Sequence, residues 1–270
     1  MFLLTVLFIS GLKAAHGYQC EDLSGVWVNE LNSTMTIVNL PFNKIIGQYR
    51  TAVESNPGAA AFTSNLTGAF LPFEGGSLLS FTVLFNHGSS LTSWVGQCLV
   101  CDGQEIIFTT WVLQRAVRNP TEQWMDTLVH QNTFTRKSSG NGGQPESQIS
   151  SATVEQSVAS PTMEGIVRGA WISGTGDILN VTNTYGNKKA EGCFNNFEII
   201  GQFDGKENFT AFGFVSPISS QKFKGGVGHI YPYDANRLGV SWLEHEFTKD
   251  CVRPRSRVFV GMDDYIRSNS

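Results

Sequence analysis

The sequence predicts an all-β protein that contains two tandem eight-stranded antiparallel up-and-down barrels. Two observations carry this prediction. Short segments of alternating apolar and polar residues follow one another with turn residues between them, and neither half shows an amphipathic helical period. Similar stretches also recur in the same order in the two halves. Each half has roughly 105–120 residues, which is enough for one domain.

The first 17 residues are typical of a secretory signal peptide. An apolar run at residues 2–12 is too short to span a bilayer, and small residues follow Lys13. The alternative is a buried N-terminal strand. No later segment is apolar enough for a membrane span, so we expect a secreted, extracellular, soluble protein. Loss of Lys13 would take the formal charge from −4 to −5, and this acidity disfavours nucleic acid as a partner.

Eight strands are expected in the first half. In the first of them, Trp27, Asn29 and Leu31 lie at period two and share a face. A buried amide beside a Trp must find partners, and a ligand could be one. Asp102-Gly103 is a typical two-residue hairpin turn. A β-sandwich is the competing architecture. The expected strands span residues 27–31, 35–40, 45–53, 65–70, 79–85, 91–100, 105–117 and 126–134.

The second half repeats features of the first. Residues 25–27 (Gly-Val-Trp) recur as 169–171 (Gly-Ala-Trp), and residues 45–49 recur as 199–203. Trp111 precedes Asn132 by 21 residues, and Trp242 precedes Asp263 by the same 21. These matches keep their order, so they indicate a tandem duplication. Between the halves lies a Ser-, Gly-, Gln- and Pro-rich stretch, expected to be a flexible linker. The expected domains are a first barrel at 20–137, a linker at 138–163 and a second barrel at 164–270.

The five cysteines are disulfide candidates in a secreted chain, and their odd number leaves one over. Cys98 and Cys101 also form a CxxC motif. A redox or zinc interpretation of it is weak, because no βαβ context or second cysteine pair accompanies it. Four Asn-x-Ser/Thr sequons indicate a glycoprotein, at Asn32, Asn65, Asn180 and Asn208.

Polar side chains recur within otherwise apolar strands of the first half. Together with aromatic residues they describe a small-molecule pocket, although each aromatic could be core and each Ser or Thr could face solvent. No P-loop, HExxH or GxSxG motif is present, and the histidines lack the spacing of a triad or metal site. We therefore expect no enzyme activity, no metal and no cofactor. The pocket candidates are Asn29, Ser33, Tyr49, Thr51, Phe85, Ser90, Thr92, Trp94, Trp111, Trp124 and Asn132.

At these residues the first half resembles the avidin and streptavidin family of biotin-binding barrels, from Cys20 to Arg136. Each matching piece is weak alone, but together and in this order they are specific. The pieces are residues 25–33 (GVWVNELNS), 47–53 (GQYRTAV), 81–83 (FTV), 94–98 (WVGQC), 110–113 (TWVL), Trp124 and 132–136 (NTFTR).

The resemblance implies a role for each position. Asn29, Ser33 and Tyr49 would donate to the ureido oxygen of biotin, much as an oxyanion hole does. Thr51 and Asn132 would accept from its two N–H groups. The remaining implied roles are Thr92 at the thiophane sulfur, Leu31, Phe85, Trp94, Trp111 and Leu113 as apolar walls, Trp124 toward the ligand of a neighbouring barrel, Ser90 near the carboxylate, and a Cys20–Cys98 disulfide; Cys101, Cys193 and Cys251 are left unassigned.

Three departures from the family pattern affect the ligand. Phe85 stands where the family typically has Trp, Gly88 replaces a hydroxyl that would help bind the carboxylate, and Glu54 would repel an anion. We therefore expect the free carboxylate of biotin to be held less well than is usual in the family. A biotinylated amide, which lacks that charge, should be affected less.

In the second half the frame is kept and the site is lost. Carboxylates would stand where a cyclic urea needs neutral partners, and one hydroxyl donor would be missing. We therefore expect a degenerate barrel. The expected correspondences are Asn29 to Ser173, Ser33 to Asp177, Tyr49 to Phe203, Thr51 to Gly205, Leu113 to Glu244 and Asn132 to Asp263.

The function that follows is non-catalytic sequestration of biotin, or of biotinylated molecules, in the first barrel. Either the two barrels pair within one chain or chains form a homo-oligomer. The alternative is an avidin-like structural or oligomerisation module without a ligand. A general lipophile carrier of the lipocalin kind is a third hypothesis, and it predicts a broader apolar cavity than these hydrogen-bonding positions suggest.

Overall fold

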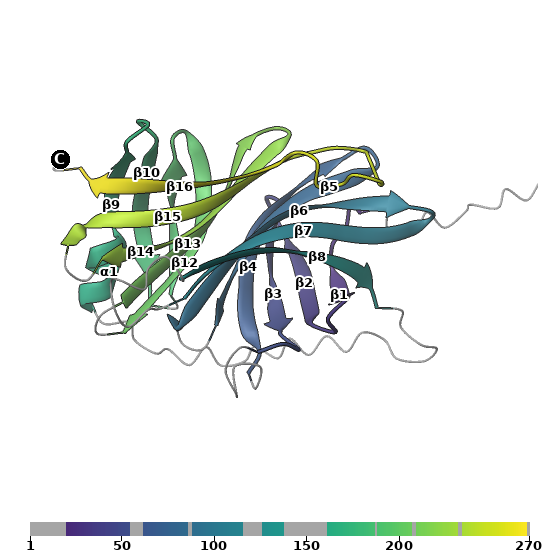
Figure 1. The fold of residues 1–270 in the computed structure, drawn as a ribbon, viewed down its shortest axis with the longest axis horizontal. Coiled ribbons are helices and arrows are strands. Elements are labelled where there is room, and N and C mark those ends of the chain that lie inside the picture. Colours follow the sequence, from purple (N-terminus) through teal and green to yellow (C-terminus); the bar gives the residue numbers. More distant parts are fainter. Residues whose placement is uncertain are drawn as a thin grey trace, which may run out of the picture.

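Two closed antiparallel barrels lie side by side in the computed structural model (Figure 1). It describes residues 20–54, 62–85, 88–115, 126–137, 161–186, 188–206, 209–231 and 234–268. In each barrel, neighbours in sequence pair in up-and-down order and the last strand closes on the first. The first barrel contains β1 (Gly25–Asn29), β2 (Thr34–Leu40), β3 (Lys44–Arg50), β4 (Ser64–Phe73), β5 (Gly76–Phe85), β6 (Ser90–Cys101), β7 (Gln104–Arg115) and β8 (Thr127–Arg136).

The second barrel has the same order of strands. It follows a short helix, α1 (Pro161–Val167), which the sequence did not predict because seven residues are too few for a helical period to show. None of the helices in the described part of the chain is long and apolar enough to cross a membrane. The strands are β9 (Gly169–Ser173), β10 (Ile178–Tyr185), β11 (Lys189–Phe194), β12 (Phe197–Lys206), β13 (Phe209–Ser219), β14 (Lys222–Tyr231), β15 (Asp234–Glu246) and β16 (Val258–Arg267).

The predicted tandem barrels are confirmed, and closure of both sheets rules out the sandwich. The prediction that the first strand continues to Leu31 is wrong. β1 ends at Asn29, whose Oδ1 accepts from the N–H groups of Leu31 at 3.1 Å and Ser33 at 2.8 Å. These two bonds turn the chain, because a side-chain acceptor competes with the strand ladder for backbone donors. Leu31 is therefore 45% exposed in the turn.

Some sequence predictions lie outside the described residues: the signal peptide, most of the linker, Trp124 and Asn208. Of the other sequons, Asn32 and Asn65 are exposed and Asn180 is half-buried.

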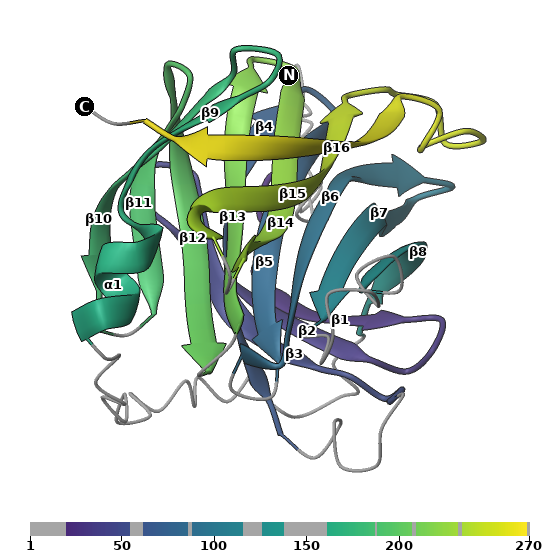
Figure 2. The same ribbon diagram turned by 60° about the vertical axis from the view of Figure 1, so that its left-hand side comes forward.

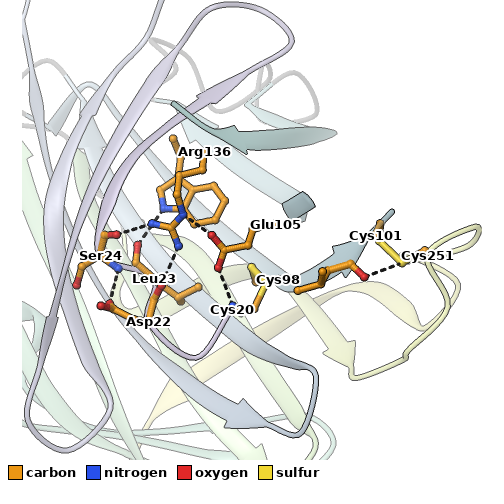
Figure 3. Close-up of a disulfide and its surroundings, with 11 residues drawn as sticks. Cys20, Asp22, Leu23, Ser24, Cys98, Cys101, Glu105, Arg136 and Cys251 are labelled. Atoms are coloured by element: carbon orange, nitrogen blue, oxygen red, sulfur yellow. Dashed lines mark hydrogen bonds and ion pairs between the residues drawn. A yellow bond between two sulfur atoms is a disulfide. The ribbon is translucent and has the colours of Figure 1, made fainter. Parts of the chain in front are cut away.

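One end of the first barrel is closed by a Trp covered by an Arg. Figure 3 shows this Arg136 among its hydrogen-bond partners. The guanidinium of Arg136 lies 4.3 Å from the centre of the buried Trp27 ring and donates to Ser24 O at 2.6 Å and to a Glu105 carboxylate oxygen. Trp27 Nε1–H donates to Leu23 O at 2.9 Å. Such a stack satisfies the indole and the guanidinium together.

The second barrel repeats this closure. Arg267 lies 4.3 Å over the ring of Trp171, and Trp171 Nε1–H donates to Val167 O of α1 at 3.1 Å. The repeated Trp–Arg stack supports the tandem duplication at the level of three-dimensional structure.

Strand registers correct two of the expected correspondences. Tyr49 belongs to the ladder Trp27–Met35–Tyr49, and the matching ladder of the second barrel is Trp171–Leu179–Phe194. Phe194, not Phe203, therefore occupies the position of Tyr49. The sequence stretch 199–203 lies on β12, the fourth strand, although the similar stretch 45–49 lies on β3, the third. The Thr51–Gly205 correspondence is wrong for the same reason.

The two barrels lie against each other (Figure 2), and an apolar cluster fills the contact between them. Glycines make the approach close: a Cβ on Gly213 would lie 2.5 Å from Leu91, and one on Gly225 would lie 2.4 Å from Ser93 Oγ. Side chains of both barrels interdigitate where the two sheets meet. The two barrels therefore pair within one chain. The buried cluster comprises Leu91, Val95 and Val112 of the first barrel with Ala211, Val227 and Leu243 of the second.

Two disulfides are present among the described residues (Figure 3). Cys20–Cys98 ties the N-terminal segment to β6, which is the pairing that the family resemblance implies. Cys101–Cys251 joins the first barrel to the second across 150 residues of chain, and Cys193 is free.

Stability should fall in acid because of His245. Its ring is fully buried, and neither nitrogen has a hydrogen-bond partner in the part of the chain that the structure describes. Burial, helped by the positive charge of Arg255, lowers the pKa of His245 from 6.5 to about 4. The unfolded chain therefore binds this proton more readily than the folded protein does. The contribution of His245 to the free energy of unfolding is fully present above pH 6.5 and is lost as the pH falls toward 4. Between pH 7 and 4.5 this contributes a loss of about 2 kcal/mol.

Urea unfolding of the wild type and of His245→Phe at the two pH values measures this contribution. The carboxylates titrate in both proteins, so the difference between them isolates the histidine. An identical pH dependence in the variant would contradict the assignment.

Candidate functional site

Aromatic rings form one wall inside the first barrel. The ring centre of Tyr49 lies 5.3 Å from Trp94 and 5.9 Å from Phe85, and Trp94 lies 6.5 Å from Trp111. Thr92 is buried two residues before Trp94 and so shares its face of β6. Three buried polar atoms on this wall have no hydrogen-bond partner among the described residues: Thr92 Oγ1, Trp94 Nε1 and Trp111 Nε1. Such orphaned groups are rare in native cores and mark places where a ligand could supply partners.

Asn29 projects inward from the end of β1 with only 5% of its surface exposed. Its Oδ1 faces the N–H groups of Leu31 and Ser33, which can only donate, so the amide orientation is fixed. The Nδ2 group has no partner among the described residues. The turn thereby leaves the donor group of a largely buried amide available to a ligand.

Ser33 and Tyr49 provide two neighbouring hydroxyls. They are hydrogen-bonded to each other, and Ser33 Oγ also accepts from Ala52 N–H at 3.0 Å. Burial is the main reason that the pKa of Tyr49 is raised to about 12, against the opposing effect of the Ser33 hydrogen bond. The phenol therefore keeps its proton at physiological pH and remains a donor.

Asn132 projects inward from β8 and is oriented by Glu30. Its Nδ2 donates to Glu30 Oε1 at 2.9 Å, and Thr133 N–H donates to the other carboxylate oxygen at 2.8 Å. Burial alone would raise the pKa of Glu30, but these hydrogen bonds outweigh it and the pKa is lowered. Because an ionised carboxylate only accepts, Asn132 Oδ1 is the atom left without a partner among the described residues.

The other predicted site residues lie in varied surroundings. Leu113 and Trp111 share the interior face of β7, and Ser90 is half-buried at the start of β6. Thr51 lies just beyond β3, and its Oγ1 donates to Val53 O at 2.7 Å and accepts from Val53 N–H at 3.2 Å. Leu31 lies in the exposed turn, away from the interior face.

The structure explains why a glycine is present at position 88. Its φ of +87° is one that side chains rarely adopt, and a Cβ there would lie 2.7 Å from Asp204 of β12. The second barrel thus excludes a hydroxyl-bearing residue at this point.

In the second barrel, an ion pair fills the corresponding interior. Strand pairing places Lys224 and Glu244 where the first barrel has Thr92 and Leu113, and Gly226 where it has Trp94. Lys224 Nζ lies 3.3 Å from Glu244 Oε1 and 4.1 Å from the centre of the Trp242 ring. A Cβ on Gly226 would lie 2.7 Å from the Phe214 ring, so that ring occupies space an indole at this position would need.

The acidic positions of the second barrel are also engaged. Trp242 Nε1–H donates to Asp263 Oδ2 at 2.7 Å, and Asn195 Nδ2 donates to Asp177 Oδ1 at 3.0 Å. Phe194, which takes the place of Tyr49, has no hydroxyl. This barrel therefore presents neither the donor set nor the open acceptor of the first.

Sequence reasoning missed Glu30 and Lys224. Glu30 follows Asn29 in an ordinary polar turn, and nothing local indicates that it reaches β8. Lys224 lies among apolar and small residues on β14, a pattern that favours burial. Its partner Glu244 could be identified only from the pairing of β14 with β15.

Comparison with known proteins places the first barrel in a family. A sequence-family model with the description Avidin family matches residues 17–137. Avidin-related protein 2 of Gallus gallus is 38% identical over 118 residues, which cover 43% of this chain and 78% of that protein. Fibropellin-1 of the sea urchin Strongylocentrotus purpuratus is 35% identical over 125 residues, 46% of this chain but only 12% of the fibropellin.

Fibropellin-3 of the same sea urchin is 36% identical over 127 residues, which span 22% of its length. The solved structure of a biotin binding protein from chicken is 35% identical and aligns with a TM-score of 0.41, covering 44% of this chain and 98% of that one. The first barrel accounts for the family match, and the chain belongs to the avidin family.

Proposed function

We propose that the first barrel binds biotin without transforming it. The proposal rests on the orientation of two buried side-chain amides, which present opposite groups to a ligand. Backbone N–H groups hold Asn29 with its donor unpartnered, and Glu30 holds Asn132 with its acceptor unpartnered. A cyclic urea offers a carbonyl oxygen beside two N–H groups, which is the complement of this arrangement. Ser33 and Tyr49 add donors beside Asn29, and the rings of Trp94 and Trp111 suit the apolar remainder of biotin.

We further propose that the protein is secreted and sequesters biotin or biotinylated molecules. The disulfides among the described residues are consistent with an oxidising compartment. The second barrel, whose interior holds its own ion pair, acts as the structural partner of the first. It packs against the first barrel and needs no ligand for this role.

Titration calorimetry of the whole chain with biotin tests the proposal, with one ligand bound per chain as the expected result. A stoichiometry of two would show that the second barrel also binds. Absence of heat, together with free passage over biotin-agarose at neutral pH, would leave the ligand-free module as the function. For each ligand, the affinity of this protein can be compared with that of a family member. The shortfall should be smaller for biotin methyl amide than for free biotin, because Gly88 and Glu54 disfavour the carboxylate.

Tyr49→Phe should weaken biotin binding about 10- to 100-fold, because leaving the ureido oxygen without one of its buried donors costs about 1–3 kcal/mol. The phenyl ring keeps its contacts with Trp94 and Phe85, so the melting temperature should hardly change. Tyr185→Phe is the matched control, since Tyr185 is exposed on β10 and bonds only Glu191 among the described contacts. Equal affinities of the two variants for biotin would exclude Tyr49 as a ligand donor.

A further inference from the structure

The loop between β15 and β16, residues 247–257, leaves the second barrel and crosses the first (Figure 2). We call this loop the strap. Gln97 of β6, fully buried, holds it at two points: its Oε1 accepts from Thr248 N–H at 3.0 Å, and its Nε2 donates to Pro254 O at 3.0 Å. The disulfide from Cys251 to Cys101 adds a covalent attachment. The strap is thereby fixed to the first barrel along β6.

Arg255 extends from the strap to the backbone of β7 and β8. Its Nε donates to Thr109 O at 3.1 Å, and its Nη2 donates to Asn132 O at 2.6 Å and to Thr133 Oγ1 at 2.8 Å. Thr109 and Asn132 are cross-strand partners, so one guanidinium joins both strands at the level of the candidate site. The guanidinium also lies 5.3 Å over the ring of Phe108.

Asn132 is thus held from two directions. Glu30 fixes the side-chain amide, and Arg255 fixes the carbonyl oxygen of the same residue. The two charged groups also act on each other, since Arg255 helps to lower the pKa of Glu30. Charge-assisted hydrogen bonds of this kind are stronger and more directional than neutral ones.

We propose that Arg255 is a positioning residue for the ligand site of the first barrel, supplied by the second barrel, which has lost its own site. This inference rests on the proposed function. Arg255 acts through Asn132 and does not touch the ligand: it keeps the Asn132 acceptor in place for one ureido N–H of biotin. A site needs such outer support because small displacements of a ligand-contacting group reduce affinity sharply.

A double-mutant cycle in the full chain tests this role. Arg255→Met should raise the Kd for biotin about tenfold, a value typical of coupling within one hydrogen-bond network. In the Asn132→Ala background the same substitution should change the Kd less than about twofold, because the group that Arg255 positions is gone. A purely structural role predicts the opposite, namely equal losses in both backgrounds. Equal losses, or no loss in the wild-type background, would overturn the proposal.

Arg257→Met is the matched control, because Arg257 lies two residues further along the chain and pairs with Glu246 of its own barrel. It should leave the affinity unchanged. Arg255→Lys keeps the charge without the planar fork and should give an intermediate loss, so it replaces Arg255→Met if that variant does not fold.

Failure of the proposed function is separable from failure of this inference. If the wild type does not bind biotin, the function is wrong, and hydrogen exchange then tests the strap without any ligand. The amide of Thr133, which donates to Glu30, should exchange about tenfold faster in Arg255→Met than in Arg257→Met. Equal exchange rates would show that Arg255 does not hold this segment.

Discussion

Glu244→Leu is expected to lower the free energy of unfolding of the second barrel by about 4 kcal/mol, although it restores the residue of the first barrel. The substitution leaves Lys224 without its carboxylate, and the lysine side chain is only 4% exposed. A buried ammonium that loses its partner keeps its desolvation penalty, and contacts with the rings of Trp242 and Phe194 compensate only in part.

The double variant Lys224→Thr/Glu244→Leu should regain most of this loss, because it removes both charges together. Urea unfolding followed by tryptophan fluorescence measures both effects. Glu246→Leu, two residues along β15, should cost less than about 1 kcal/mol, because its pairs with Lys222 and Arg257 are partly open to solvent. If the single and double variants are equally unstable, the ion pair is not what fills this interior.

Removing the disulfide between the barrels should have a comparable effect. The double variant Cys101→Ser/Cys251→Ser opens a loop of 150 residues, and closing a loop of this size lowers the conformational entropy of the unfolded chain by an amount equivalent to about 5 kcal/mol. Urea unfolding under non-reducing conditions should show the corresponding loss. The strap would keep its hydrogen bonds to Gln97, so we expect the folded state to retain its paired barrels.

Cys193→Ser is the control for this experiment, because Cys193 is the free cysteine among the described residues and should change stability by less than about 0.5 kcal/mol. An unfolding midpoint that stays the same without the Cys101–Cys251 bond would mean that the packed faces alone hold the barrels together. The affinity for biotin, measured on the same variant, reports separately whether the strap needs its covalent attachment.

The strand pattern and the duplication could be predicted from the sequence, because alternation of apolar side chains reports which residues share a face of a strand. Candidate pocket residues could be listed because polar and aromatic side chains recur within apolar strands, but their roles toward a ligand could be assigned only because the first half resembles a known family. Leu31 shows the limit of periodicity: the pattern continued to it, but the Asn29 side chain turned the backbone two residues earlier.

The similarity of residues 45–49 and 199–203 shows a second limit. Five residues with the same pattern suit more than one inward-facing strand, so their likeness could not reveal that one lies on the third strand and the other on the fourth. The register between strands decided it, because pairing depends on turns and loop lengths that differ between the halves. The counterpart of Tyr49 became Phe194 only when the ladders were compared.

By itself, therefore, the sequence determined the all-β class, the two repeated halves and the faces on which their apolar residues lie, since these depend on neighbours along the chain. Tertiary structure alone decided that Lys224 fills one interior, that Glu30 orients Asn132 in the other, and that Cys251 and Arg255 reach across to the first barrel. Each of these contacts joins residues separated by 20 to 150 positions. No local pattern records such pairings, because they arise only when closed barrels bring distant strands and loops together.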